Sequence, residues 1–275
     1  ALKGIGVEKE FAAQDVEITV QAGEDWDEFV RYCVEQDLAG VECLSGIPGL
    51  IGGTPIQNVG AYGQEVSETI VAVRCFDREA LEFTTLPHGD CGFEYRKSLF
   101  NTIHQNRYIV LEVTFRLKRG GEPRVNYKDL RELFAERKPS LREVRDAVLT
   151  VRRAKSMVID NDDPNSQSAG SFFKNPIVTA GKLEQLQAAH GVIPYFDSPE
   201  GMAKIPAAWL IENSGFNKGF ILGNAGISTK HTLALINRGN ATAAEMLALK
   251  EAIQNGVNEK FGIQLQPEPV FIGFT

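Results

Sequence analysis

The spacing of apolar residues predicts a mixture of strands and helices in the first part of the chain. In residues 15–22 and 108–117 apolar and polar side chains alternate, which is typical of strands with one buried face. Residues 69–77 are expected to form a further strand. In residues 24–37 the apolar side chains recur at helical spacing and form a single stripe, so a helix is expected there.

The middle of the chain is predicted to be a loop region followed by a helix. Residues 118–139 contain many charges, two adjacent glycines and two prolines, which favours a loop with one short element. Ser140 and Glu143 have the spacing of a capping box, so a helix should begin directly after Ser140. Residues 158–169 are polar and turn-forming, and we place the boundary between two domains there.

The second half alternates between helices and strands without strict β-α-β repetition. The expected elements are, in order, an extended segment (171–179), a helix (182–190) ending at Gly191, a helix from Pro206 to Gly215, a strand (232–238), a helix after the capping box Thr242 and Glu245, and a closing strand (263–273). This succession favours an α+β arrangement in two domains.

Composition excludes several classes of function. The chain has 275 residues with 29 Lys and Arg against 36 Asp and Glu, a formal net charge of −7. This acidic balance argues against a nucleic-acid partner and against a membrane surface. No apolar run approaches the ~20 residues of a membrane span, and no basic-then-apolar leader opens the sequence. We therefore expect a cytoplasmic protein without a secretory signal.

The cysteines and histidines favour neither disulfides nor a metal site. Cys33, Cys43, Cys75 and Cys91 form no C-x-x-C pair, and a chain of this length does not depend on disulfides for its stability. We expect them to be reduced and structural, as in a reducing cytoplasm. The four histidines are scattered singly, so no protein-bound catalytic metal is expected.

Residues 45–65 are the richest candidate for chemistry. Six glycines in this segment allow the backbone to approach a ligand closely. The segment matches neither the P-loop nor the G-x-G-x-x-G dinucleotide fingerprint. Composition alone leaves a simple connection between strands open. The interleaved Ile47, Pro48, Ile51, Ile56 and Val59 would suit a flat aromatic cofactor better than a free phosphate.

Ordered motifs along nearly the whole chain resemble one enzyme family. The glycine segment contains G-I-P-G, G-G, P-I-Q-N and G-A-Y-G, and it is followed by YRKSLF (95–100), NYKDL (126–130), GSFFKNP (170–176), PAAWLIE (206–212), NRGNATA (237–243), EKFGIQLQPEP (259–269) and FIG (271–273). This set resembles the UDP-N-acetylenolpyruvoylglucosamine reductase (MurB) family of bacterial peptidoglycan synthesis. The segment around Tyr127 is similar to the type I branch of the family.

The resemblance implies a two-step reaction of a flavoprotein oxidoreductase. NADPH reduces bound FAD and leaves, and UDP-N-acetylglucosamine enolpyruvate then enters the same cleft. The substrate receives a hydride at its β-carbon and a proton at its α-carbon, and UDP-N-acetylmuramate is the product. The pathway serves cell-wall biogenesis, and through it cell shape and cell division. A monomer without nucleic-acid or membrane partners is expected.

The resemblance also implies the fold and the domain ranges. A partial FAD-binding domain of the PCMH or vanillyl-alcohol-oxidase type is expected in residues 1–118. A connecting loop and helix, carrying a tyrosine that closes over the substrate, should occupy residues 119–164. An α+β substrate-binding domain should occupy residues 165–275.

Three residues are candidate catalytic groups. Hydride addition drives negative charge onto the substrate carboxylate, and the planar fork of Arg96 suits bidentate pairing with that group. Ser171 occupies the family's catalytic serine position, where a hydroxyl could donate the proton if neighbours polarise it. Glu268 matches the second catalytic position and precedes a buried-looking strand, Val270 to Ile272. The sequence does not divide the roles of Ser171 and Glu268.

The remaining site residues follow from the resemblance alone. The expected FAD contacts are Ile47, Pro48, Gly49, Gly53, Ile56, Asn58, Val59, Gly60 and Val110. The expected contacts with the nucleotide sugar are Tyr62, Tyr127, Lys155, Asn175, Lys204 and His231. Tyr127 and Lys155 are expected to close over the diphosphate, because a lysine offers a point charge and a tyrosine both stacks and donates.

Two departures from the family pattern leave alternatives open. The family's flavin domain begins with a stretch that carries a G-G-G-S-N phosphate loop, and this motif does not occur here. An N-terminally truncated fragment is therefore expected, which puts FAD retention in question. Val270 stands where some members have an arginine near the flavin. The alternatives are another flavin dehydrogenase or oxidase that shares only the flavin domain, and a nucleotide-sugar-binding fragment without turnover.

Overall fold

The structure, a computed structural model, describes residues 2–10, 14–135 and 137–273. Its contacts divide the chain into two compact units, residues 1–153 and 154–275. The elements of the first unit are β1 (Ile5–Glu10), β2 (Asp15–Gln21), α1 (Trp26–Glu35), β3 (Leu38–Ala39), η1 (Glu42–Leu44), η2 (Ile51–Gly53), β4 (Gly60–Ala61), β5 (Gln64–Glu65), η3 (Val66–Glu68), β6 (Ile70–Asp77), β7 (Glu82–Pro87), η4 (His88–Asp90), η5 (Leu99–Asn101), β8 (Tyr108–Arg119), α2 (Lys128–Leu133) and α3 (Leu141–Ala154).

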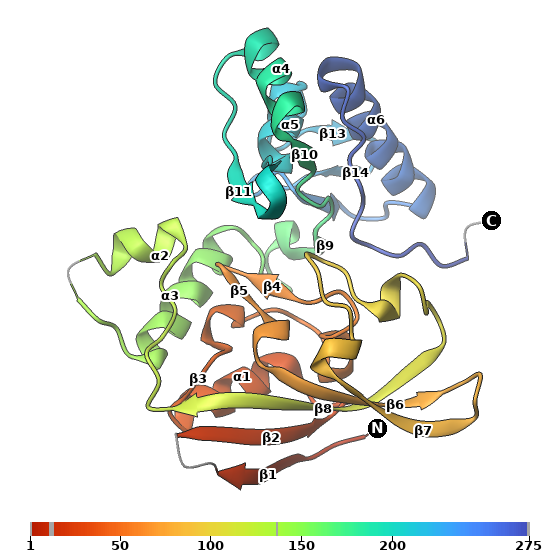
Figure 1. Ribbon diagram of the computed structural model, residues 1–275. Coiled ribbons are helices and arrows are strands. Elements are labelled where there is room, and N and C mark those ends of the chain that lie inside the picture. Colours follow the sequence, from red (N-terminus) through yellow and green to blue (C-terminus); the bar gives the residue numbers. More distant parts are fainter. Residues whose placement is uncertain (1, 11–13, 136, 274–275) are drawn as a thin grey trace. The chain divides into compact units, whose positions relative to one another are not determined.

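An antiparallel sheet organises the first unit (Figure 1). Its order is β1-β2-β8-β6-β7, and β3 also pairs with β8. The long strand β8 lies at the centre, where Val113 is opposite Val20 of β2 and Val73 of β6. All three valines are fully buried. The alternation in residues 108–117 therefore predicts the buried face correctly for Val113, Phe115 and Leu117, whereas Ile109 at the start of the strand is 50 % exposed.

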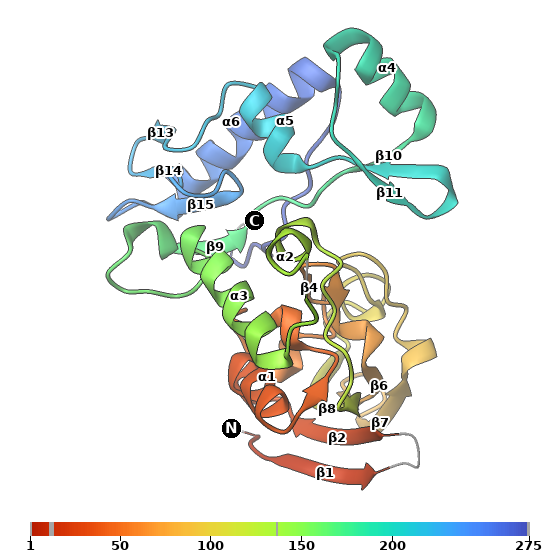
Figure 2. The ribbon, with the colours of Figure 1, turned by 90° about the vertical axis from the view of Figure 1, so that its left-hand side faces the viewer.

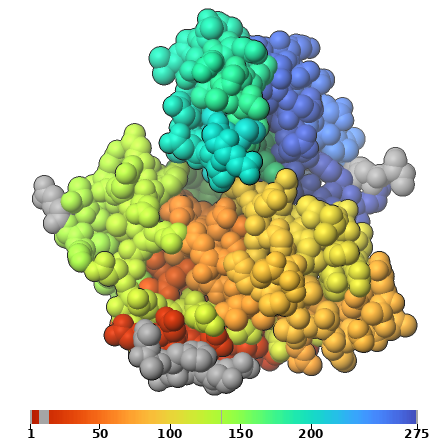
Figure 3. All heavy atoms as spheres, in the orientation of Figure 1, coloured from red at the N-terminus to blue at the C-terminus, as the bar shows by residue number. Residues whose placement is uncertain are grey.

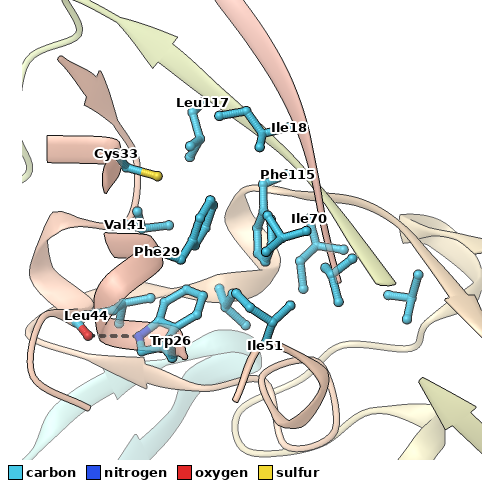
Figure 4. Close-up of a cluster of buried hydrophobic side chains, with 14 of the residues drawn as sticks. Ile18, Trp26, Phe29, Cys33, Val41, Leu44, Ile51, Ile70, Phe115 and Leu117 are labelled. Carbon is cyan, nitrogen blue, oxygen red and sulfur yellow. Dashed lines mark hydrogen bonds between the residues drawn. The ribbon is translucent and has the colours of Figure 1, made fainter. Parts of the chain in front are cut away.

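An aromatic cluster joins α1 to this sheet (Figure 4). Trp26 and Phe29 of α1 lie 6.1 and 4.9 Å from the ring of Phe115 in β8. Each buried ring of this size contributes on the order of 1.5–3 kcal/mol relative to exposure. The Trp26 Nε1–H donates to the carbonyl oxygen of Leu44 at 3.0 Å. The core thereby anchors the chain at the point where the glycine-rich segment begins.

Helix α3 begins at the predicted capping box and lies beside α1 (Figure 2). The Ser140 N–H donates to the Glu143 carboxylate at 2.8 Å, and the Glu143 N–H donates to the Ser140 hydroxyl oxygen at 3.3 Å. Val144 and Val148 of α3 pack with Leu130 of α2 and with Cys43. The helix is thus part of the first unit.

In its described residues, the second unit combines two small antiparallel sheets with three α-helices. Its elements are η6 (Pro164–Ser166), β9 (Ser168–Ser171), β10 (Ile177–Thr179), α4 (Ala180–His190), β11 (Phe196–Ser198), η7 (Pro199–Gly201), β12 (Met202–Lys204), α5 (Ala207–Asn213), β13 (Ile221–Leu222), β14 (Ala225–Ile227), β15 (Ala234–Asn237) and α6 (Ala243–Phe261). The sheet orders are β10-β12-β11 and β13-β14-β15-β9. Helix α6 packs against α5 and β14.

Helix α6 confirms the second predicted capping box. The Thr242 hydroxyl accepts from the Glu245 N–H at 3.2 Å, and the Glu245 carboxylate accepts from the Thr242 N–H at 2.8 Å. Leu249, Ile253 and Val257 follow at intervals of four and are fully buried. They form one stripe of the core of the second unit.

One expected strand is wrong and another expected extended segment is divided. Residues 263–273 form no strand, and the segment contributes only the isolated bridge of Pro267 with Phe173. Pro267 and Pro269 have no N–H to give to a ladder, which explains the failure. In the segment 171–179, β9 ends at Ser171 and β10 begins only at Ile177. The apolar pattern did not indicate β1 or β7, which form the two edges of the first sheet.

Two further expectations concern cysteines and membranes. All four cysteines are free thiols buried in the first unit, as predicted. No helix in the described part of the chain combines the length and the apolar character that crossing a bilayer requires.

Candidate active site

The glycine-rich segment of the first unit is open toward solvent at two glycines. A Cβ atom on Gly49 or Gly53 would meet no heavy atom of the described residues within 4 Å, apart from those of its chain neighbours. Pro48 and Leu50 beside them are exposed. Figure 3 shows the orange part of the chain, around residues 50–70, at the surface of the first unit. The segment therefore has open space at its glycines and exposed apolar side chains beside them, so a ligand can reach its backbone.

The predicted flavin contacts lie on or beside this segment. Ile47, Ile56 and Val59 are half-buried and pack against the main core, so their inner sides are held while their outer sides remain accessible. Val110 belongs to β8, opposite Cys75, and is also half-buried. Apart from Val110, all predicted FAD contacts lie within residues 47–60.

Arg96 lies against the end of the glycine segment. Its guanidinium donates to the carbonyl oxygen of Asn58 at 3.3 Å and to that of Gly60. It also lies 5.2 Å from the centroid of the Tyr95 ring. A Cβ atom on Gly60 would come within 2.9 Å of the Arg96 guanidinium, so any larger residue here would force the guanidinium to shift from this position. The structure thus joins two motifs that are 36 residues apart in the chain.

Left-handed backbone conformations concentrate at this place. Asn58, Tyr62 and Arg96 have φ values of 45°, 50° and 55°. Non-glycine residues pay about 1 kcal/mol or more for such conformations, which persist where the surroundings impose them and which cluster at functional sites. The Asn58 side chain shows what imposes them here. Its amide donates to Glu65 at 2.8 Å and to the Glu94 carbonyl at 3.0 Å, and its oxygen accepts from the Ser67 N–H at 3.1 Å.

Tyr62 and Tyr127 are brought together in the first unit. Their rings lie 5.3 Å apart in an edge-to-face arrangement. Burial raises the pKa of Tyr62 to about 12 and also raises the pKa of Tyr127. Arg152 of α3 is buried and donates a hydrogen bond to Tyr62. Both hydroxyls therefore stay protonated at neutral pH and can donate hydrogen bonds to an anionic ligand.

An ion pair between helices holds the start of the glycine segment. Arg145 of α3 donates to both carboxylate oxygens of Asp27 in α1, at 2.6 and 2.8 Å. Asp27 also accepts from the Gly46 N–H at 2.6 Å. Burial alone would raise the pKa of Asp27, but the hydrogen bonds from Arg145 and Gly46 outweigh it and lower that pKa from its ordinary value of 3.8. The pair thereby connects α1 and α3 to Gly46, near the start of the glycine-rich segment.

The variant Asp27→Asn is expected to lower the free energy of unfolding by about 2 kcal/mol, because it leaves the largely buried Arg145 guanidinium without a charged acceptor. The folded-state pKa of Asp27 is depressed. The stabilisation is therefore present above the unfolded-state pKa and is lost as the pH falls through the folded-state pKa. Urea titrations from about pH 7 down to about pH 3 measure the free energy of unfolding of wild type and variant. The difference between the two should become smaller as the pH falls.

A matched control is Glu28→Gln on the same helix. Glu28 pairs with Arg31, and the side chains are 62 % and 49 % exposed. Exposed pairs of this kind contribute only ~0.3–0.5 kcal/mol, so the control should change stability little. Equal effects of the two variants would contradict the role assigned to Asp27.

In the second unit the segments of Ser171 and Glu268 are adjacent. Ser171 ends β9 and lies opposite Ala234 of β15. The Glu268 N–H donates to the carbonyl oxygen of Phe172 at 2.8 Å, one residue after Ser171. Phe173 and Pro267 form an isolated bridge beside them. Two motifs almost 100 residues apart thus meet at one edge, with both predicted catalytic side chains half-buried.

The predicted strand after Glu268 is absent. Val270 and Ile272 are 71 % and 85 % exposed, so the segment Val270 to Ile272 is neither buried nor extended in a sheet. The apolar letters of this segment suggested a core strand, but the proline on each side of Glu268 prevents ladder formation.

The structure gives the four remaining predicted residues different surroundings. The Asn175 side-chain oxygen accepts from the Ala207 N–H at 2.8 Å and so caps α5. Lys204 lies in the middle strand β12, opposite Ile177 on one side and Phe196 on the other. His231 is half-buried in a turn held by Ser228, whose hydroxyl accepts from the His231 N–H at 3.3 Å.

Lys155 is the first residue after α3. It is followed by Ser156, which is buried, has φ of 54° and donates to Asp163 at 2.5 Å. The left-handed conformation of Ser156 ends the helical path of the backbone directly after Lys155. Arg96, Tyr62 and Tyr127 belong to the first unit, whereas Ser171, Glu268 and Lys155 belong to the second.

The first unit fits a flat apolar cofactor. The open space at Gly49 and Gly53, the half-exposed Ile47 and Ile56, and the exposed Pro48 together form a surface that a planar ring system can approach. The backbone of this surface is held by the residues before and at the start of α1, since the Trp26 N–H donates to the Gly49 carbonyl at 3.0 Å and the Gly52 N–H donates to the Ala22 carbonyl at 2.9 Å. These features fit the FAD expected from the sequence.

Comparisons with known proteins identify the family. Residues 162–272 match the profile of the C-terminal domain of UDP-N-acetylenolpyruvoylglucosamine reductase, and residues 5–81 match an FAD-binding domain. The reductase of Thermobifida fusca is 48 % identical over 271 residues, which cover 94 % of this chain and 76 % of that protein. The chain belongs to the UDP-N-acetylenolpyruvoylglucosamine reductase family.

Further relatives and a solved structure agree with this assignment. The reductase of Saccharopolyspora erythraea is 46 % identical, over 94 % of this chain and 73 % of that protein. The crystal structure of the MurB reductase from Thermus caldophilus matches with a TM-score of 0.61 and 25 % identity, over 91 % of this chain and 70 % of that chain. The predicted family, the α+β fold with an FAD-binding domain, and the class of flavin-dependent oxidoreductase are confirmed.

Sequence reasoning missed the residues that hold Gly46 and Tyr62 in place. Asp27 occupies the first turn of an amphipathic helix, where an acidic residue is ordinarily explained by the helix dipole. Arg145 and Arg152 are separated by seven residues and therefore lie on one face of α3, but charges at this spacing also occur on solvated faces. Their burial was the informative signal, and no sequence pattern contains it.

Proposed function

We propose that this chain catalyses the NADPH-dependent, FAD-mediated reduction of UDP-N-acetylglucosamine enolpyruvate to UDP-N-acetylmuramate. Membership in the reductase family supports this activity. The observation that carries the proposal is the position of Arg96, whose guanidinium lies at the carbonyls of Asn58 and Gly60 in the glycine-rich segment. A carboxylate-binding group beside the surface for the cofactor is what reduction of an enolpyruvyl ether requires.

The first unit would hold FAD through the glycine-rich segment. Gly49 and Gly53 give the ring access to the backbone, and Ile47, Ile56 and Val59 give it apolar contact. The chemistry that FAD supplies when bound is hydride transfer from NADPH to the β-carbon of the enolpyruvyl group.

Arg96 is proposed to stabilise the charge that develops on the substrate carboxylate. As the vinyl group is reduced, negative charge spreads onto the two carboxylate oxygens. A guanidinium aimed at them is worth more in a partly buried site than in water. The hydrogen bonds to the Asn58 and Gly60 carbonyls orient the guanidinium in advance. A lysine could supply the charge but not the two-pronged geometry.

Ser171 is proposed to donate the proton that the α-carbon receives. A hydroxyl is a weak acid, so the donation depends on close approach and on a polar environment. Glu268 is proposed to assist protonation or to position the substrate, since its backbone is bound to the Phe172 carbonyl next to Ser171. The two residues would act from one edge of the second unit.

The nucleotide sugar is proposed to bind through Tyr62, Tyr127, Lys155, Asn175, Lys204 and His231. The protonated hydroxyls of the tyrosine pair would donate to the diphosphate, and Lys155 would add a positive charge. Lys204, flanked by Ile177 and Phe196, offers a cation between apolar side chains. Asn175 already caps α5, so only its NH₂ group remains to meet a ligand.

The test is a spectroscopic titration of the chain itself. Purified protein is loaded with FAD and desalted, and a retained two-band visible spectrum is expected. NADPH should bleach this spectrum without oxygen, and UDP-N-acetylglucosamine enolpyruvate should then restore it. Rapid reoxidation by oxygen without any response to the UDP-sugar would instead favour another flavin oxidase. A colourless protein that binds the UDP-sugar in a calorimeter would be a binding fragment without turnover.

We further propose a cytoplasmic monomer. The reductant NADPH and the four free thiols are consistent with a reducing compartment. Size-exclusion chromatography with light scattering checks the monomer, and a dimer mass would contradict it.

A further inference from the structure

Glu42 is a carboxylate enclosed in the first unit, and its surroundings show a specific use. The side chain is 1 % exposed. One oxygen accepts from the Gly40 N–H at 2.8 Å, and the other accepts from the Arg124 N–H at 2.9 Å and from the Gln64 amide at 3.3 Å. A buried charged group is costly unless hydrogen bonds of this kind replace its hydration.

Gln64 extends the contact to a third stretch of backbone. Its side chain is 3 % exposed, and its oxygen accepts from the Cys43 N–H at 2.9 Å. The Cys43 thiol in turn donates to the Arg124 carbonyl oxygen at 3.0 Å. Glu42, Gln64 and Cys43, which we call the Glu42 clasp, therefore bind residue 124 at both its N–H and its carbonyl.

The clasp lies next to both tyrosines of the proposed substrate site. Gln64 belongs to β5, and the turn between β4 and β5 carries Tyr62. Arg124 precedes Tyr127 by three residues, and its guanidinium binds Glu68 and the Gly63 carbonyl. The stretch from Gly121 to Asn126 contains no helix or strand. The clasp holds its backbone at residue 124, beside the side-chain contacts of Arg124 and the packing of Val125.

We propose that Glu42 is a positioning residue that sets the approach of Tyr127 to Tyr62, and through it the affinity for the UDP-sugar. This inference rests on the proposed function, in which the two tyrosines contact the substrate. Without the carboxylate, the stretch before Tyr127 loses the acceptor for its Arg124 N–H, and the edge-to-face pair loses its fixed geometry. The effect should fall on substrate binding and not on the reaction with NADPH.

The variant Glu42→Gln replaces one acceptor oxygen with an NH₂ group that opposes a backbone N–H. Its KM for the UDP-sugar should rise by about 10-fold, on the scale of one lost charged hydrogen bond. The rate of flavin reduction by NADPH and the kcat at saturating UDP-sugar should change less than about twofold. The variant should fold, because glutamine has nearly the same size and shape as glutamate and keeps one acceptor oxygen for the neighbouring N–H groups.

Asp77→Asn provides a control for a purely structural effect. Asp77 is 4 % exposed and accepts from Arg107 at 2.6 Å and from the N–H groups of Glu79 and Ala80 at 2.9 and 3.2 Å. It is therefore a comparable buried carboxylate, but at the end of β6. Asp77→Asn should lower the melting temperature without raising the KM. A raised KM in both variants would overturn the proposal.

A double-mutant cycle with Tyr127→Ala separates the inference from the function on which it rests. If Glu42 acts through Tyr127, Glu42→Gln should raise the KM no further in the Tyr127→Ala background. Independent, multiplying effects would overturn the inference and leave the function standing. An unchanged KM in Tyr127→Ala alone would overturn the proposed binding role of Tyr127, and the inference with it.

Discussion

Replacing Ser171 with alanine should slow the reaction with the UDP-sugar by about 10²–10⁴-fold, the range expected for loss of a general acid. The rate of flavin reduction by NADPH should remain unchanged, because that step needs no proton at the α-carbon of the substrate. Rapid mixing of pre-reduced enzyme with UDP-N-acetylglucosamine enolpyruvate measures the first rate. Mixing oxidised enzyme with NADPH measures the second. The split between the two rates is the signature of the proposed role.

Ser214→Ala is the matched control for this experiment. Ser214 follows α5 in the same unit, and its hydroxyl donates to the Leu210 carbonyl at 2.9 Å. Loss of this hydrogen bond should cost about 1 kcal/mol of stability and leave both rates intact. If Ser171→Ala leaves the second half-reaction as fast as in the wild type, Ser171 is not the acid. Glu268→Gln then becomes the next variant to measure.

Replacing Arg96 with glutamine should lower the rate of the second half-reaction by about 10²–10³-fold, as for the loss of one donor to a developing oxyanion. Arg96→Lys should recover only part of the loss, because an ammonium cannot reproduce the two-pronged contact with a carboxylate. The hydrogen bonds of Arg96 to the Asn58 and Gly60 carbonyls add a second expectation. The melting temperature should fall in both variants, since neither replacement reproduces the guanidinium hydrogen bonds to both carbonyl oxygens.

Arg74→Gln is the control for Arg96. Arg74 pairs with Glu112 on the open face of the sheet and is 48 % exposed. This variant should change neither rate and should alter stability by less than ~1 kcal/mol. If Arg96→Gln slows both half-reactions equally, the residue supports the fold of the glycine segment and not the developing charge. Equal rates in Arg96→Lys and wild type would contradict the need for a planar fork.

Some elements were predictable because their signals are local. The capping boxes at Ser140 and Thr242 indicated where α3 and α6 begin, since each box satisfies its own backbone N–H groups within four residues. The alternation in residues 108–117 indicated the central strand of the sheet, because a half-buried strand places every second side chain on one face. The strand expected at 263–273 failed because apolar letters do not compensate for two prolines that cannot pair.

The sequence by itself determined the family and the fold class, and it supplied the catalytic residues as a prediction. Arg96, Ser171 and Glu268 were predicted to be catalytic from motifs that are contiguous in the chain, and such motifs can be recognised without knowing any contacts. Only the tertiary structure decided which side chains support them. Asp27 and Arg145 are joined across 118 positions, and Glu42 is joined to Gln64 across 22 positions and to Arg124 across 82. The sequence does not distinguish a buried, hydrogen-bonded charged residue from an exposed one, because burial depends on what the rest of the chain places around it.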